Sequence, residues 1–351
     1  MGYDGTTATA DYEHEDEHEH DLQGRQMAKF YLIVNNGYSV QDNPEPEEWV
    51  RPIAAAGVRY IEYFADHMDP LFARRVVARR SEYFQATMRT LRKHRIKVVS
   101  VGTGRLSYLV NVLSHPYADM AEEGLRWCKA MVDEAAAMGA RFIAGHYDYI
   151  SQSELRAWSD EKMDLLIGRL LRLASYARRK GLEGICLEQM YTPHLKPYTV
   201  AEGREMLEAL NARAAVPFMM HADTGHMAVA AKEDKNHTAQ DKDPYYWLRQ
   251  TYGGMKKIFI HLQQTDATAS RHWPFTPERN KQGIIEARKV IEAIEESGVE
   301  EAFLSFEILY PRGTTIDKIT PEIVESVRHF EKTFVEMGYR VKDSVCVKDK
   351  R

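Results

Sequence analysis

Four side chains of the types that bind metal ions end four successive apolar segments of this chain. In chain order they are Glu188, Asp223, His261 and Glu307. A buried strand cannot hold a lone carboxylate cheaply in free energy, and pairing or metal coordination is the usual remedy. A salt bridge would explain any one of them alone, but four in succession favour one shared site. Three carboxylates and one imidazole suit a single divalent ion, Mn²⁺ or Mg²⁺ first, with Co²⁺ or Zn²⁺ as alternatives.

Other polar side chains follow the predicted strands and are candidates for substrate binding. His226 comes three residues after Asp223, where it is expected to reach a substrate oxygen while Asp223 holds the metal. Arg271 could bind a sugar oxygen or a phosphate in bidentate fashion. Arg312 follows the last predicted strand and could bind a phosphate, although a plain turn explains it nearly as well. The remaining candidates are His67, His146 and His194.

The segments that must position these residues alternate between short apolar runs and amphipathic stretches. The predicted strands span 29–36, 58–64, 96–101, 140–146, 182–189, 216–222, 256–263 and 301–308. The predicted helices span 44–57, 72–95, 116–139, 160–181, 200–212, 244–252, 283–297 and 321–337. Glycine ends several of these helices, as it commonly does. Those glycines are Gly57, Gly139, Gly181 and Gly298.

Eight strand–helix repeats in a chain of this length predict an α/β fold, a (β/α)8 TIM barrel. An open doubly wound sheet is the alternative, but no G-x-G-x-x-G motif follows the first strand. The active face of such a barrel lies at the carboxyl ends of its strands. All four candidate metal ligands fall there, so they are expected to converge.

The two ends of the chain differ from the predicted barrel in composition. Residues 1–26 are acidic and rich in histidine, with almost nothing to bury, so a disordered tail is expected there. Residues 27–340 are expected to form a single catalytic domain, and residues 341–351 a polar C-terminal tail.

The overall composition excludes several classes of function. A formal net charge of −5 gives no basic surface for nucleic acid. No apolar run is long enough to span a membrane, and no secretory signal is recognisable. The three cysteines are far apart and odd in number, which is typical of a reduced, cytoplasmic protein. The expected partner is a small sugar or sugar phosphate, and homo-oligomerisation is left open.

The pattern of candidate residues resembles the sugar-phosphate isomerase and epimerase superfamily, the xylose-isomerase-like barrels that include the ketose 3-epimerases. The resemblance covers about residues 29–338, and its most specific part is Asp223-x-x-His226 at the sixth strand. It implies a Glu-Asp-His-Glu metal site in which Glu188 and Glu307 also transfer the proton. In such a site His226 contacts the substrate.

Two positions depart from the pattern of the ketose 3-epimerases. Those enzymes usually carry a second glutamate six residues after the first, where this chain has His194. Their arginine shortly after the metal-binding histidine is replaced at the usual offset by Ala267, so Arg271 is a displaced candidate. Both positions recognise substrate in that family, which leaves the sugar open. Segments 263–266 and 271–275 look most like the tetrulose-phosphate epimerases of erythritol catabolism.

The resemblance implies an isomerase that moves a proton at the carbon next to a ketose carbonyl, with Glu188 and Glu307 as base and acid. Two glutamates in the ligand set favour epimerisation over aldose–ketose isomerisation. A dehydratase acting on a keto-sugar or inosose is the nearest alternative. A metal phosphodiesterase of the apurinic-endonuclease kind would require more histidine ligands and a basic groove. A non-catalytic sugar-binding barrel is the alternative of a different class.

Overall fold

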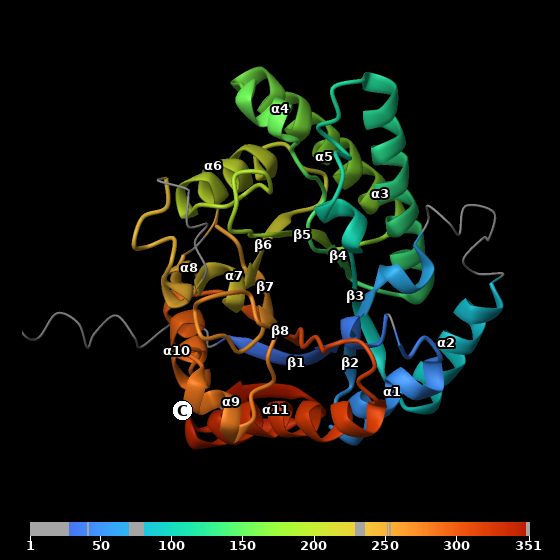
Figure 1. Cartoon of the computed structure of the whole chain (residues 1–351), viewed down its shortest axis with the longest axis vertical. Coiled ribbons are helices and arrows are strands. Elements are labelled where there is room, and N and C mark those ends of the chain that lie inside the picture. Colours follow the sequence, from blue (N-terminus) through green and yellow to red (C-terminus); the bar gives the residue numbers. More distant parts are fainter. Residues whose placement is uncertain are drawn as a thin grey trace, which may run out of the picture.

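The protein is a closed barrel of eight parallel strands surrounded by helices, which confirms the predicted TIM barrel (Figure 1). The computed structural model describes residues 28–40, 42–69, 81–228, 236–250, 252 and 254–348. The expected tail over residues 1–26 lies outside this part of the chain. The barrel closes because β1 pairs in parallel with both β8 and β2. The assignment of the barrel as a single catalytic domain remains a prediction.

The strands match the predicted segments to within a few residues. They are β1 (Lys29–Asn35), β2 (Tyr60–Phe64), β3 (Lys97–Gly102), β4 (Phe142–Ala144), β5 (Gly184–Glu188), β6 (Phe218–Asp223), β7 (Lys257–Leu262) and β8 (Glu301–Phe306). Nearly all their residues are buried. Burial on both faces is why the strands are continuous apolar runs in the sequence instead of alternating polar and apolar residues.

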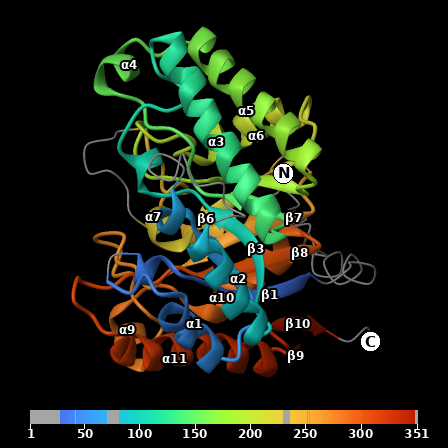
Figure 2. The ribbon, with the colours of Figure 1, turned by 90° about the vertical axis from the view of Figure 1, so that its right-hand side faces the viewer.

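The helices form a ring outside the strands (Figures 1 and 2). They are α1 (Pro46–Ala55), α2 (Glu82–Lys93), α3 (Ala118–Met138), α4 (Gln152–Arg156), α5 (Asp160–Lys180), α6 (Val200–Asn211), α7 (Thr224–Ala228), α8 (Pro244–Arg249), α9 (Pro277–Gln282), α10 (Ala287–Ser297) and α11 (Ile316–Glu336). Gly139 and Gly181 end α3 and α5 in the left-handed conformation, with φ of 74° and 84°, as predicted. The part of the predicted helix 72–95 that precedes residue 81 lies outside the described residues.

The last helix begins earlier than the sequence suggested. Proline is favoured in the first turn of a helix, which made Pro321 the expected start of the helix. The structure places the start of α11 at Ile316, so that expectation is wrong. Ile316, Ile319 and Ile323 are all buried and recur at helical spacing. Burial of this apolar face extends the helix upstream and outweighs the missing N–H of the proline.

The polar tail expected over residues 341–351 is instead a β-hairpin as far as residue 348. The hairpin consists of β9 (Tyr339–Lys342) and β10 (Val345–Lys348), and β10 pairs antiparallel with the first half of β1. It lies beside β1 and α11 in Figure 2. Tyr339 and Cys346 are buried, and the Tyr339 ring packs edge-on against Phe30 with centroids 5.5 Å apart. Two buried side chains among charged neighbours anchor this segment, and composition alone does not reveal that.

Charged side chains close the amino-terminal end of the barrel, opposite the predicted active face. The Arg141 guanidinium lies 2.8 Å from Glu183 and 3.1 Å from Glu301, and it stacks over the ring of Phe303. Lys257 bridges the same two carboxylates at 2.9 and 3.1 Å. Because these groups neutralise one another, they stabilise the barrel end without forming a cation or anion site.

A buried carboxyl group on α3 is expected to make stability depend on pH. Burial, with a contribution from nearby Asp69, raises the pKa of Glu134 to about 8. In the unfolded chain the pKa of a glutamate is about 4.3. Between these values the folded protein holds a proton that the unfolded chain has released. The free energy of unfolding therefore falls with rising pH, by up to about 1.4 kcal/mol per pH unit.

The variant Glu134→Gln should lack this pH-dependent loss. We expect its melting temperature to exceed that of the wild type at pH 8 to 9, and the difference to shrink toward pH 4.5. Thermal melts across this range measure the effect. Glu208→Gln, at an exposed position of α6, is the matched control. Parallel pH profiles for the wild type and Glu134→Gln would show that Glu134 does not titrate as described.

Candidate metal centre

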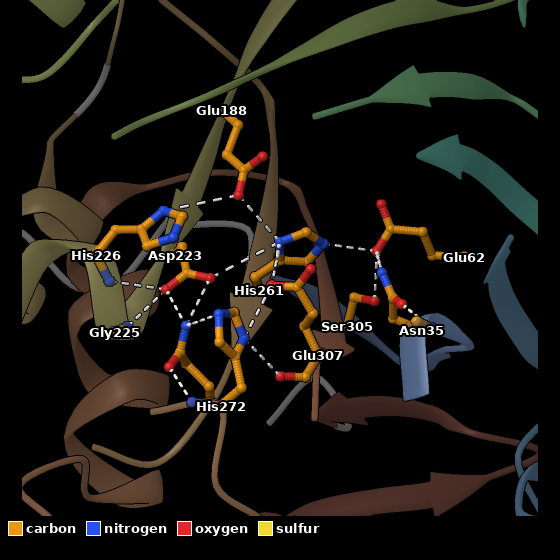
Figure 3. A network of polar contacts seen from close by, with 12 residues as sticks. Asn35, Glu62, Glu188, Asp223, Gly225, His226, His261, His272, Ser305 and Glu307 are labelled. Carbon is orange, nitrogen blue, oxygen red and sulfur yellow. Dashed lines mark hydrogen bonds and ion pairs between the residues drawn. The ribbon is translucent and has the colours of Figure 1, made fainter. Parts of the chain in front are cut away.

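The structure brings Glu188, Asp223, His261 and Glu307 together at the carboxyl end of the barrel (Figure 3). Glu188 and Asp223 are the last residues of β5 and β6, His261 is the second-last residue of β7, and Glu307 directly follows β8. One potential ligand atom from each lies within 4.8 Å of those from the other three. Parallel strands of the barrel end at the same face, so residues as far apart in the sequence as Glu188 and Glu307, 119 positions, become neighbours.

The spacing of the four side chains suits a single ion. His261 Nδ1 lies 3.2 Å from Glu307 Oε2, 3.3 Å from Glu188 Oε1 and 3.8 Å from Asp223 Oδ2. Nitrogen and oxygen ligands bind a divalent ion such as Zn²⁺ at about 2.0–2.2 Å, which places neighbouring ligands roughly 3 to 4 Å apart. The three carboxylates are therefore already at the separations from His261 that one shared ion would impose.

The electrostatics of the cluster also favour a cation. Burial alone would lower the pKa of His261, but Glu307 and other carboxylates outweigh burial and raise it well above its usual value. Burial likewise opposes ionisation of Glu188, yet the contact with His261 holds its pKa below the usual range. Buried anions in this number require positive charge for compensation. Without an ion, a second proton on the His261 ring supplies part of it. A divalent ion bound at Nδ1 would replace that proton and supply more positive charge.

Three hydrogen bonds hold Asp223 through Oδ1, and a fourth reaches Oδ2. Its Oδ1 accepts from the main-chain N–H of Gly225 at 2.7 Å and from that of His226 at 2.8 Å. Gln263 Nε2 donates to the same Oδ1 at 2.9 Å and approaches Oδ2 at 3.1 Å. Oδ2 is the oxygen that faces His261. The turn from β6 into α7 thus fixes the carboxylate before any ion arrives.

Glu188 has a partner that the sequence did not reveal. Tyr108, in the short 3-10 helix Arg105–Tyr108 after β3, donates its hydroxyl to Glu188 Oε2 at 2.5 Å. The other oxygen, Oε1, faces His261 and lies 3.7 Å from His226 Nδ1. His226 is buried beside Glu188, and its contact with a substrate stays a prediction. The ring of His146 lies 5.6 Å from that of Tyr108, so this predicted residue stands next to the partner of Glu188.

The loop after β7 presents His272 to the centre and turns the predicted Arg271 away. His272 Nδ1 lies 3.4 Å from Glu307 Oε2, and the His272 main-chain N–H donates to Gln263 Oε1 at 2.6 Å. Its φ of 50° lies in the left-handed region that non-glycine residues rarely adopt. Arg271 pairs with Asp266 at 3.0 Å and is well exposed. In this structure the side chain next to Glu307 is therefore the histidine, one residue beyond the predicted arginine.

The other predicted substrate-binding residues lie outside the cluster. His194 stacks on Tyr149, and its Nδ1 lies 2.6 Å from the Ile150 carbonyl oxygen. His67 lies between the hydroxyls of Ser39 and Tyr83, at 3.0 and 3.1 Å. Arg312 is exposed in the turn after β8. In the part of the chain that the structure describes, none of these three makes a polar contact with the four candidate ligands, so a direct role for them stays a prediction.

A further carboxylate, Glu62 on β2, binds the far side of His261. Its Oε2 lies 2.7 Å from His261 Nε2. The same oxygen accepts from Asn35 Nδ2 at 3.0 Å and from Ser305 Oγ at 2.8 Å. The sequence carried one weak signal for it, a glutamate inside an otherwise apolar strand segment. A lone glutamate in a strand is weak evidence by itself, and its partner His261 lies 199 positions away in the sequence.

Comparison with known proteins places the chain in a family. Residues 50–333 match the family model of the xylose isomerase-like TIM barrel, so the chain belongs to that family and the resemblance seen in the sequence is confirmed. No curated protein sequence matches the chain. The structure of a putative xylose isomerase from Rhodospirillum rubrum is similar, with a TM-score of 0.74 and 22% identity over 86% of this chain and 99% of that one.

Two further solved structures share the fold at lower similarity. D-allulose 3-epimerase from Methylomonas sp. has a TM-score of 0.59 and 16% identity, covering 88% of this chain and 98% of that one. The IolI protein, in a structure with a bound zinc atom, has a TM-score of 0.58 and 16% identity, covering 87% and 97%. At these identities the likeness concerns the fold alone. In the part of the chain that the structure describes, no helix is long and apolar enough to cross a membrane.

Proposed function

We propose that the protein is a divalent-metal-dependent epimerase or isomerase of a small ketose or ketose phosphate, with a tetrulose phosphate as the favoured substrate. One observation carries the proposal. Two glutamates, Glu188 and Glu307, converge with Asp223 and His261 on a single point at the active end of a barrel. A family that contains sugar isomerases and a similar fold in a D-allulose 3-epimerase support it.

The donor set fits one divalent ion held by the four side chains, with Mn²⁺ or Mg²⁺ favoured. The IolI structure with zinc supports a divalent ion in this kind of barrel. An ion at this position would act as a Lewis acid and acidify the carbon next to the ketose carbonyl. Removal and return of the proton are then left to the protein's own carboxylates.

Glu188 and Glu307 are the proposed proton-transfer pair. They come from different strands and lie above and below His261 in Figure 3. Contacts with His261 and Tyr108 hold Glu188, while His272 and His261 hold Glu307. If one glutamate removes the proton from one face and the other returns a proton to the opposite face, the carbon is inverted. This is epimerisation, whereas one glutamate acting between two carbons gives aldose–ketose isomerisation.

Substrate recognition is proposed for the side chains around this pair. His226 lies beside Glu188, in reach of a bound hydroxyl. Arg271 could leave its ion pair with Asp266 to bind a phosphate group of the substrate. Arg312 is exposed and is the second candidate for that phosphate. His67, His146 and His194 remain candidates further from the centre. Cytoplasmic location and homo-oligomerisation remain predictions as well.

Solvent exchange tests this function directly. The protein would be incubated with Mn²⁺ in D₂O and, in turn, with tetruloses, pentuloses, hexuloses and their phosphates, and the products followed by NMR. Deuterium at the carbon next to the carbonyl, together with the epimer or the aldose, is the expected result. Binding without deuterium entry for every sugar would indicate a non-catalytic barrel and overturn the proposal. Loss of water from the sugar would identify a dehydratase instead.

A further inference from the structure

A second polar layer lies on the far side of His261 from the three carboxylates of the candidate metal centre (Figure 3). It consists of Glu62 from β2, Asn35 from β1 and Ser305 from β8, each at most 1% exposed. All three strands lie outside the run from β5 to β7 that supplies three of the candidate ligands. Of the four candidate ligands, His261 is the one that this layer contacts in the described part of the chain.

The two nitrogens of His261 face different groups. Nδ1 points at the three carboxylates of the metal centre, and Nε2 points at Glu62 (Figure 3). A neutral imidazole carries one N–H, and its position is set by whichever nitrogen has a hydrogen-bond acceptor. A proton on Nε2, donated to Glu62, leaves the lone pair of Nδ1 directed at the point that the carboxylates surround. That is the tautomer a metal ligand requires.

We infer that Glu62 is a positioning residue that fixes the tautomer and ring orientation of His261 as a metal ligand. The inference rests on the proposed metal centre. Asn35 and Ser305 both donate to the oxygen of Glu62 that meets His261, so they keep this carboxylate in place. Carboxylate partners of this kind raise the basicity of a ligating histidine and typically change metal affinity about 10- to 100-fold.

A different arrangement of the same residues is less compatible with the geometry. Glu62, His221 and His261 also lie close enough to hold an ion of their own. The distance of 2.7 Å between His261 Nε2 and Glu62 Oε2, however, is that of a hydrogen bond. Two ligands of one ion lie roughly 3 Å apart or more. His261 also cannot keep a proton on Nε2 and coordinate a second ion there.

The test is the affinity of the full chain for Mn²⁺ alone, measured by electron paramagnetic resonance on Glu62→Gln. We expect Mn²⁺ affinity to fall about 10- to 100-fold, with the fold intact by circular dichroism. Glu134→Gln, which changes a buried carboxyl group on α3, is the matched control and should bind Mn²⁺ as the wild type does. Binding that survives Asp223→Ala is subtracted, because His14, His18 and His20 could also bind metal.

A spectroscopic measurement separates positioning from general loss of structure. Long-range ¹H–¹⁵N correlation with a diamagnetic ion, Mg²⁺ or Zn²⁺, reports the protonated nitrogen of His261. We expect protonated Nε2 in the wild type and a mixed or reversed tautomer in Glu62→Gln. If Glu62→Gln does not fold, Ser305→Ala keeps the carboxylate but removes one donor, and a smaller, few-fold loss of Mn²⁺ affinity is expected.

The outcomes distinguish this inference from the proposed function. A wild-type protein that binds no Mn²⁺ beyond the level of Asp223→Ala would contradict the metal centre itself. Mn²⁺ binding in the wild type, with unchanged affinity and an unchanged His261 tautomer in Glu62→Gln, would overturn only the role of Glu62. If Glu62→Gln does not fold, unchanged Mn²⁺ affinity and an unchanged His261 tautomer in Ser305→Ala would overturn the role of Glu62.

Discussion

Glu188→Gln and Glu307→Gln are each expected to lower turnover by about 10²- to 10⁴-fold, with the fold retained. This is the range that a positioned general acid or base contributes to a reaction. An amide keeps the shape of the side chain and one coordinating oxygen, but it cannot accept and return a proton. The effect is measured as the steady-state rate with the ketose that the deuterium-exchange screen identifies as a substrate. Glu208→Gln, exposed on α6, is the matched control and should react at the wild-type rate.

The two variants should also differ in the epimer whose proton they exchange with solvent. If the glutamates work on opposite faces, Glu188→Gln should still exchange the proton of the epimer that faces Glu307, and Glu307→Gln the reverse. Deuterium entry without inversion, measured separately from each epimer, would therefore assign the faces. Near-wild-type turnover in either variant would remove that glutamate from the reaction. Equal loss of exchange from both epimers would favour a single-glutamate isomerase.

Removal of divalent ions is expected to abolish activity, and Mn²⁺ or a similar ion is expected to restore it. Without the ion, no Lewis acid polarises the ketose carbonyl, so the proton on the next carbon is less acidic. The clustered carboxylates also repel one another. Activity after dialysis against a chelator, and after stepwise addition of Mn²⁺, Mg²⁺, Co²⁺ or Zn²⁺, measures this. Full activity in protein shown by elemental analysis to be free of metal would contradict the metal-dependent mechanism.

Metal binding should also be visible without any substrate. A ligand that binds only the folded protein stabilises it by about 2.7 kcal/mol at a hundred times its dissociation constant. The melting temperature should therefore rise on addition of Mn²⁺ in the wild type, and much less in Asp223→Ala. An equal rise in both proteins would place the bound ion elsewhere, for example on the histidines near the N-terminus.

The barrel itself could be predicted because its signals are local. Eight apolar runs alternate with amphipathic stretches, and glycines such as Gly139 and Gly181 end the helices between them. Each signal depends on residues a few positions apart. The start of α11 and the C-terminal hairpin were predicted incorrectly because they depend on contacts with distant residues. Ile316 is buried in the hydrophobic core, and Tyr339 packs against Phe30 at the opposite end of the sequence.

The convergence of the four candidate ligands followed from the sequence once the barrel was recognised. Parallel strands of a barrel end at the same face, so strand-end residues must meet there. The side chains that contact these ligands cannot be predicted from strand ends in this way. Tyr108 and His272 reach the centre from loops, and loop conformation is set by contacts that residue spacing does not encode. Arg271 and His272 are adjacent in the sequence, yet only the fold shows which of them faces Glu307.

The sequence by itself determined the strand–helix order, and with it the set of carboxylate and imidazole side chains at one end of the barrel. Only the tertiary structure decided how those side chains are held. Glu62 meets His261 across 199 positions because closure of the barrel brings β2 to face β7. Closure is a property of the whole sheet, so a hydrogen bond across its interior becomes visible only when the strands are in place.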